Sequence, residues 1–276
     1  MKAALLQLTS GDDPAENLAA TTALIAQAAQ QGAGFVLTPE VTNCVSQDRS
    51  HQQAVLSREP GDPTLAGLRD CARQHGIWLS IGSLALQTGD RDGRFANRSF
   101  LVDPSGRIHA RYDKIHMFDV TVSESESYRE SAGYRPGRKA VVAETPFAKI
   151  GLSVCYDVRF AYLYRALAQA GAEVLLVPSA FSPVTGAAHW EPLLRARAIE
   201  TGSYVLAAAQ TGSHPATAGK PRKTYGHAMA VSPWGEVLVD MGEEPGVAVV
   251  DLDLSEVAKC RNRIASLQHD RPFEGP

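Results

Sequence analysis

The sequence has few cysteines, no long apolar run and no excess of charge of either sign, and each shortage excludes a class of protein. Its four cysteines, Cys44, Cys71, Cys155 and Cys260, are scattered over 276 residues. They form neither a CxxC pair nor a Cys/His cluster of the kind that binds metal. We therefore expect no metal site and reduced thiols, which are typical of a cytoplasmic protein.

The charge balance argues against two classes of partner. The formal net charge is -3, from 27 basic and 30 acidic residues, so binding to nucleic acid or to an anionic membrane is not indicated. No apolar run reaches the roughly 18 residues that a membrane-spanning helix needs. The segment Met1–Leu8 is too short and becomes polar too soon for a signal peptide, and we expect it to begin the fold as a strand.

The remaining composition is that of an ordinary globular protein, with 44% hydrophobic and 21% charged residues. The chain is long enough to bury one large core. It contains no repeat of solenoid length and no low-complexity linker. We expect one domain over residues 1–276, in which 269–276 form a polar C-terminal tail.

Strand and helix patterns alternate along most of the chain, and hairpins interrupt the alternation, which favours mixed sheets covered by helices. Between 113 and 139 the pattern is lost, and we expect a long polar loop, which inside a domain is usually functional or disordered. Strands are predicted at 2–8, 34–37, 77–84, 94–102, 107–112, around 141, and at 150–154, 172–178, 203–210, 227–231, 237–240 and 247–252. Helices are predicted at 14–31, 63–74, 160–171, 189–201 and 255–264.

Cys155 stands where a buried strand, Ile150–Val154, ends and a helical run from Phe160 begins. A strand-to-helix turn lifts a side chain off the end of a sheet and leaves backbone N–H groups pointing toward it. A thiol in that position can attack a carbonyl, and an adjacent N–H can receive the oxyanion. Taken alone, Cys155 is more typical of a small buried hydrophobic residue, which is how most free cysteines behave.

Two charged residues also follow predicted strands. Glu40 comes after the strand at 34–37, and Lys114 comes after the strand at 107–112. Open α/β sheets collect their functional sites at the carboxyl ends of strands. Taken singly, each of these residues could be an ordinary solvated surface charge.

Together, three stretches resemble the signature segments of the nitrilase (carbon–nitrogen hydrolase) superfamily, in the same order and at similar spacing. They are Thr38-Pro39-Glu40, Tyr112-Asp113-Lys114-Ile115-His116 and Val154-Cys155-Tyr156-Asp157-Val158-Arg159-Phe160. The resemblance extends from the first strand to Asp253. It implies an α/β fold arranged as a four-layer α-β-β-α sandwich, a small-molecule amide substrate, no cofactor, and a homodimer paired through its outer helices.

The resemblance also implies a catalytic triad of Glu40, Lys114 and Cys155. Cys155 would form a thioester with the acyl group, and water would then release the acid. Glu40 would serve as general base and then as acid, for which its pKa should lie near the working pH. Lys114 and the N–H of Tyr156 would stabilise the oxyanion. Glu130 matches a second glutamate that orients the lysine, although it could also be a loop charge.

Further segments resemble the branch that contains deaminated glutathione amidase and ω-amidase, and the former more closely. These segments are 178–181, 185–191, 194–201, 207–212 and 225–227. Substrates of this branch are ω-amides of an α-keto acid, so a cation must hold their carboxylate. Arg159 could supply it through a bidentate contact, or could instead pair with Asp157 or Glu173. Phe181 and Trp190, with Tyr156, could wall the acyl pocket or belong to the core.

Other activities remain open at this point. An ω-amidase acting on 2-oxoglutaramate-type amides, an N-carbamoyl amino acid hydrolase and a nitrilase would share the three signature segments. A catalytically silent binding module on the same fold would be the alternative outside enzymology, against which intact Glu40, Lys114 and Cys155 argue.

Overall fold

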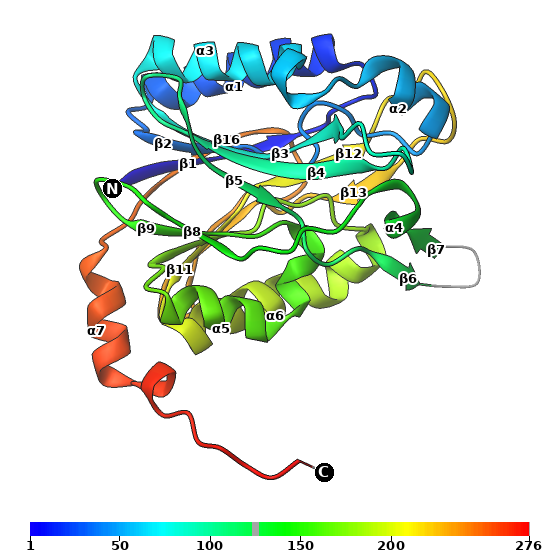
Figure 1. The fold of residues 1–276 in the computed structure, drawn as a ribbon. Helices are drawn as coiled ribbons and strands as arrows, with labels where there is room; N and C mark the ends of the chain where they lie inside the picture. The colour runs from blue at the N-terminus through cyan, green and yellow to red at the C-terminus, as the bar shows by residue number, and fades with distance from the viewer. Residues whose placement is uncertain (123–126, 276) are drawn as a thin grey trace.

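Two β-sheets packed face to face form the centre of the computed structural model, which describes residues 1–122 and 127–275 (Figure 1). The order in the larger sheet is β13-β12-β1-β2-β3-β4-β5, with β16 beside β1, and in the smaller it is β15-β14-β11-β10-β9-β8. The larger sheet contains β1 (Lys2–Leu8), β2 (Phe35–Leu37), β3 (Trp78–Gln87), β4 (Phe95–Val102), β5 (Ile108–Asp113), β12 (Ala209–Ser213), β13 (Lys223–Tyr225) and β16 (Gly246–Asp251). The smaller contains β8 (Val141–Glu144), β9 (Lys149–Leu152), β10 (Val174–Leu176), β11 (Tyr204–Ala207), β14 (Met229–Val231) and β15 (Val237–Asp240).

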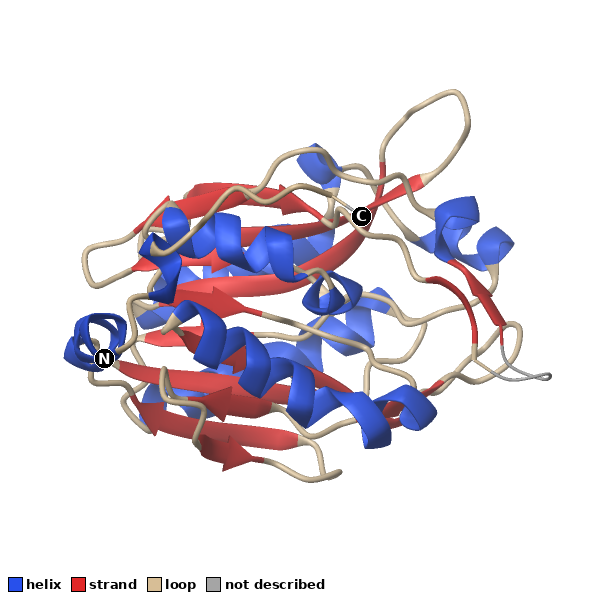
Figure 2. Cartoon of the chain, turned by 90° about the horizontal axis from the view of Figure 1, so that it is seen from below, coloured by secondary structure: helices blue, strands red, loops and turns tan. Residues whose placement is uncertain are grey.

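Helices cover the outer faces of both sheets, which makes the four-layer α-β-β-α sandwich that the family resemblance implies. Figure 1 shows α1 (Pro14–Gln30) and α3 (Pro63–His75) on the larger sheet, and α5 (Ala161–Gln169) and α6 (Pro183–Thr201) on the smaller. Figure 2, seen from below, shows helices lying across the strands. The other helical segments are α2 (Arg49–Val55), α4 (Glu130–Gly133), α7 (Ser255–Arg263), η1 (Glu59–Gly61), η2 (Cys155–Arg159) and η3 (Ser266–Gln268). In the described ranges no helix is both long and apolar enough to cross a membrane.

The strand β1 shows why the layers form. Successive side chains of a strand point to opposite faces, so Leu5 packs between the two sheets with Leu206, and Leu6 packs beneath the helices with Ile25 and Leu68. Both faces of β1 are therefore buried. This explains why its sequence is a continuous apolar run and does not alternate with polar residues.

Capping residues explain where the helices begin and end. The side chain of Asp13 accepts a hydrogen bond from the N–H of Ala15 at 2.7 Å, so Asp13 caps α1. Asp62 caps α3 through the N–H of Leu65, and Gly76, with a φ of 63°, ends it.

Several boundaries differ from the sequence prediction. The helix α6 begins at Pro183 and not at His189, because Ser182 caps it and proline suits a first helical turn. The helix expected over 160–171 is present as α5, and the 3₁₀ turn η2, which was not predicted, precedes it. The sequence analysis missed α2 and β13.

The segment predicted as a patternless loop, 113–139, contains regular structure. Its strands β6 (Asp119–Thr121) and β7 (Ser127–Arg129) pair antiparallel, and α4 follows them. Residues 123–126 of the predicted loop lie outside the described residues. Strands of three residues carry too little apolar periodicity to be recognised in a sequence.

One glycine lets the segment that carries Glu40 approach the sheet. The pairing of β3 with β4 shifts register between Ile81 and Leu84, and Gly82 lies in that irregularity. A Cβ atom on Gly82 would lie 1.9 Å from the carbonyl oxygen of Thr38 and 2.5 Å from that of Pro39. No side chain fits there, so the position of Glu40 depends on Gly82.

We predict that Gly82→Ala destabilises the protein and lowers its activity, because the collision is with backbone that cannot rotate away. Overpacking typically costs about 1–3 kcal/mol and occasionally more. Gly34→Ala is the matched control, since a Cβ there meets nothing within 4 Å. Thermal melts should show a clear decrease for Gly82→Ala and little change for Gly34→Ala. Equal melting temperatures of the two variants would contradict the packing argument.

Candidate active site

The three residues expected to form a catalytic triad line one cavity of about 360 Å³. Glu40 follows β2 and Lys114 follows β5, both in the larger sheet, whereas Cys155 follows β9 in the smaller. All three side chains are buried, with exposed fractions of 4%, 2% and 7%. The cavity thus lies where strand ends of the two sheets meet.

Lys114 is held between two carboxylates. Its Nζ lies 2.9 Å from Oε1 of Glu40, and 2.9 Å and 2.8 Å from the two carboxylate oxygens of Glu130. Glu130 is fixed in turn by the N–H of Phe118, which donates to Oε2 at 2.7 Å. The structure therefore places Glu130 against Lys114, where it can orient the ammonium group.

Glu40 is oriented by two further donors. Nδ2 of Asn97 donates to Oε1 at 2.8 Å, and the N–H of Ala180 donates to Oε2 at 2.9 Å. The same Nδ2 lies 3.4 Å from Oε1 of Glu130, so Asn97 spans both carboxylates. The sequence analysis missed Asn97, which stands in the middle of β4 with no motif around it.

The charges in this cluster set the protonation states. Burial alone would lower the pKa of Lys114, but Glu130 and Glu40 outweigh it and hold that pKa well above its usual value. Burial alone would raise the pKa of Glu40, but Lys114 outweighs it and the net shift is downward. The expectation that burial brings the Glu40 pKa near working pH is therefore wrong for the unliganded protein, where Glu40 is a carboxylate.

Cys155 lies in a strained turn. Its φ is 52°, in the left-handed region that residues other than glycine rarely adopt. Its own N–H donates to the carbonyl of Pro178 at 2.9 Å. Cys155 begins the 3₁₀ turn η2, so the N–H of Tyr156 belongs to the first turn, where helical N–H groups have no partner within the helix.

Asp157 fixes this turn to the segment around Lys114. Its carboxylate accepts from the N–H of Val154 at 2.9 Å, from the hydroxyl of Tyr112 at 2.6 Å and from the N–H of His116 at 3.0 Å. Tyr112 and His116 lie two residues before and after Lys114. One fully buried carboxylate thus holds the thiol and the lysine in register.

The thiol of Cys155 and the carboxylate of Glu40 line the same cavity. Burial, and then the negative charge of Glu40, raise the pKa of Cys155 far above its usual value. The proton therefore rests on sulfur, in a cavity that also holds an ionised carboxylate. A reaction that consumes the thiolate can draw the proton to Glu40 in the same step.

The predicted substrate-binding residues occupy different positions. Tyr156 and Phe181 line the cavity, whereas Trp190 is not among its lining residues. The Trp190 ring lies behind Phe181, with ring centroids 4.9 Å apart, and its Nε1 donates to the carbonyl of His227 at 2.8 Å. Trp190 therefore supports the wall of the cavity from behind.

Arg159 also lies behind that wall. Its guanidinium carbon is 5.8 Å and 5.4 Å from the ring centroids of Tyr156 and Phe181. Arg159 is not a lining residue of the cavity. Neither suggested carboxylate pairs with it in the structure, since Asp157 binds the turn and Glu173 accepts from the N–H of Lys149.

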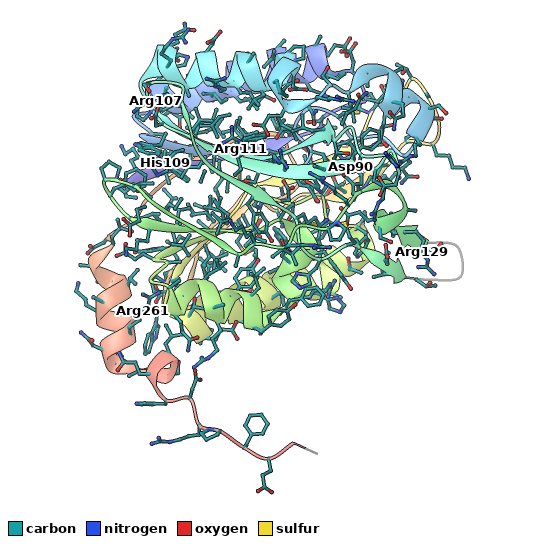
Figure 3. All side chains as sticks on the ribbon, in the orientation of Figure 1. Asp90, Arg107, His109, Arg111, Arg129 and Arg261 are labelled. Atoms are coloured by element: carbon teal, nitrogen blue, oxygen red, sulfur yellow. The ribbon has the colours of Figure 1, made fainter. Side chains whose placement is uncertain are left out.

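Two arginines that the sequence analysis did not consider do line the cavity, Arg49 on α2 and Arg222 before β13. Each lies in a segment that was read as irregular, so no pattern pointed to it. Arg129 on β7 lines the cavity as well, and Figure 3 shows it at the outer edge of the molecule. In the described ranges no group of three or more His, Cys, Asp and Glu side chains could hold a metal ion.

His214 anchors the loop that ends at Arg222. One ring nitrogen lies 2.7 Å from the carbonyl of Ser10 and the other lies 2.7 Å from the hydroxyl of Thr224. The N–H of His214 donates to the carbonyl of Arg222 at 2.9 Å. Burial lowers the pKa of His214 to about 4, so the folded loop contains the neutral imidazole.

Comparisons with known proteins agree with this geometry. Residues 2–262 match the family model described as carbon-nitrogen hydrolase. The chain is 41% identical over 269 residues to the deaminated glutathione amidase of Yersinia enterocolitica, covering 97% of this chain and 92% of that protein.

Two solved structures share the fold. The C. elegans NitFhit protein superposes with a TM-score of 0.89 at 35% identity, covering 98% of this chain and 65% of that longer chain. An amidase from Nesterenkonia sp. AN1 superposes with a TM-score of 0.77 at 30% identity, covering 96% of this chain and 98% of that chain. That structure is of a Glu-to-Gln variant in which acrylamide has added to the active-site cysteine.

We predict that His214 makes the protein less stable in acid. Its pKa is about 4 when folded and near 6.5 when unfolded, so the unfolded chain binds the proton more tightly. The stabilisation is complete above pH 6.5 and is lost as the pH falls toward 4, by about 3 kcal/mol.

Chemical denaturation between pH 4 and 7 checks this. His214→Gln should flatten the pH dependence, and His269→Gln, in the exposed tail, should not. The same dependence of unfolding free energy on pH in His214→Gln and in the wild type would contradict the proposed role of His214.

Proposed function

Since this chain belongs to the carbon–nitrogen hydrolase family, we propose that it is a cysteine-dependent amidase whose substrate is deaminated glutathione. The observation that carries the proposal is that Cys155 shares one buried cavity with Glu40 and Lys114. The similarity to deaminated glutathione amidase supports the choice of substrate. In that compound the free amino group of glutathione is replaced by a keto group.

In the first half-reaction, the sulfur of Cys155 attacks the amide carbon while its proton passes to Glu40. The resulting oxyanion is stabilised by Lys114 and by the N–H of Tyr156. Glu40 then gives the proton to the nitrogen, the carbon–nitrogen bond breaks, and the amine leaves. The products of this step are a 2-oxoglutaryl thioester on Cys155 and the dipeptide Cys-Gly.

In the second half-reaction, Glu40 takes a proton from water, which attacks the thioester carbonyl at the place that the amine has vacated. The carbon–sulfur bond breaks, the sulfur recovers a proton from Glu40, and 2-oxoglutarate leaves. Glu40 therefore alternates between base and acid, for which a buried carboxylate in the same cavity as the thiol is suited. Glu130 takes no proton in this scheme and keeps Lys114 in position.

Lys114 retains its charge throughout. The two carboxylates beside it outweigh the effect of burial and keep it protonated, so it acts as a fixed cation and not as a base. A preorganised cation in a site closed to water stabilises developing negative charge more strongly than it could in solution.

We also propose a homodimer in a cytoplasmic setting. Large apolar side chains are exposed on the outer helices of the smaller sheet, among them Tyr162 at 67%, Val184 at 57% and Ile199 at 55%. A second copy packed on this layer would cover them. All four cysteines are unpaired and buried, which is compatible with a reducing compartment.

We predict that the wild-type protein hydrolyses deaminated glutathione and that Cys155→Ala does not, because the alanine has no nucleophile. Released Cys-Gly and 2-oxoglutarate can be quantified by chromatography. Cys44→Ala, Cys71→Ala and Cys260→Ala are matched controls that should keep most of the activity. Turnover by Cys155→Ala would end the covalent mechanism, and a wild type active only on nitriles or N-carbamoyl amino acids would contradict the proposed substrate.

We further predict that Arg159 favours anionic acyl groups. Its position behind Tyr156 and Phe181 supports a long-range role toward the α-keto carboxylate, which a neutral acyl group lacks. Arg159→Ala should lower kcat/KM for α-keto ω-amides and change it much less for a neutral amide of similar length. An equal loss of kcat/KM on both amides, with a lower melting temperature, would show that Arg159 only supports the packing of Tyr156 and Phe181.

A further inference from the structure

Arg222 is a cavity cation that the proposed catalytic chemistry does not use. Its Nη2 donates to the carbonyl of Ala180 at 2.6 Å, and its guanidinium carbon lies 6.0 Å from the ring centroid of Tyr128. Its Nε is buried without a hydrogen-bond partner. Among the residues that the structure describes, no carboxylate lies within salt-bridge distance of Arg222.

The charge of Arg222 is therefore available to a ligand. Lys114, by contrast, is already bracketed by Glu40 and Glu130. Arg49 adds to the positive character, since it lines the same cavity and its Nη1 is also buried without a partner. Buried N–H groups without acceptors are costly, and an anion bound in the cavity would relieve that cost.

The position of Arg222 relative to Glu40 indicates which part of the substrate Arg222 faces. Ala180 contacts both residues, because its carbonyl accepts from Arg222 and its N–H donates to Oε2 of Glu40. After burial and Lys114, Arg222 is the next charge that acts on the Glu40 carboxyl. Glu40 protonates the departing nitrogen, so Arg222 lies on the side of the leaving amine.

We propose that Arg222 binds a carboxylate carried by the leaving amine and so selects amides of amino acids or short peptides over amides that release ammonia. This inference rests on the proposed amidase function and deepens it. An extended dipeptide places its carboxylate about 7 Å from the scissile nitrogen. The group that holds it must therefore belong to the wall of the cavity and not to the catalytic residues, as Arg222 does.

The test uses three substrates that form the same acyl-enzyme on Cys155. They are deaminated glutathione, its C-terminal carboxamide, and 2-oxoglutaramate, which releases ammonia. Their hydrolysis shares the thioester and its breakdown, so differences in kcat/KM report the leaving group alone.

We expect Arg222→Met to lower kcat/KM at least about 30-fold for deaminated glutathione, since losing a buried charged contact has an effect of this size. It should change the values for the carboxamide and for 2-oxoglutaramate less than about threefold. The inhibition constant of Cys-Gly should rise in parallel. Arg222→Lys should recover part of the loss, because lysine keeps the positive charge but lacks the planar guanidinium that can bind a carboxylate through two hydrogen bonds.

The control is Lys220→Met, which removes a positive charge from an exposed position in the same loop and should leave all three substrates unaffected. An equal loss on all three substrates in Arg222→Met would show that Arg222 merely supports Ala180 and Glu40, and would overturn the inference. A wild type that prefers the carboxamide would overturn it as well. A wild type inactive on all three would instead refute the proposed function, and the inference with it.

Discussion

The buried ammonium group of Lys114, held between Glu40 and Glu130, is the interaction on which the rest of the site depends. It joins residues from three separate segments, and each of its three contacts is 2.8 or 2.9 Å long. A charged cluster of this kind is stable in a dry interior only when every member is paired, because removing one partner leaves an uncompensated buried charge. The two carboxylates thus keep Lys114 protonated, and Lys114 keeps Glu40 ionised beside a protonated thiol.

The nucleophile depends on a second constraint, which joins the two sheets. The positive φ of Cys155 is unfavourable for a residue with a side chain. It persists because the Asp157 carboxylate binds the turn on one side and the segment around Lys114 on the other. The apolar core between the sheets keeps the two sheets in this relative position, since strands of both contribute to one continuous apolar cluster. The sandwich is therefore the frame that brings strand ends from two sheets to one cavity.

Much of this could be predicted from the sequence. Periodic apolar segments identified most of the strands and long helices, and three polar segments at strand ends pointed to Glu40, Lys114 and Cys155. The short elements β6, β7 and α2 lacked enough periodicity to be recognised. Asn97 and Arg222 could not have been found either, because their importance comes from neighbours 57 and 42 residues away in the chain. The Glu40 pKa was misjudged because the sequence did not show that the Lys114 ammonium group lies 2.9 Å from the Glu40 carboxylate.

The central claim is that the amide is cleaved through a thioester on Cys155. Mass spectrometry of wild-type protein quenched during turnover of deaminated glutathione tests it most directly. The account predicts that the peptide containing Cys155 carries a 2-oxoglutaryl group, that the adduct disappears as substrate is exhausted, and that Cys44, Cys71 and Cys260 stay unmodified. Turnover with no adduct at any time, or an adduct on another cysteine that forms and decays at the catalytic rate, would contradict it.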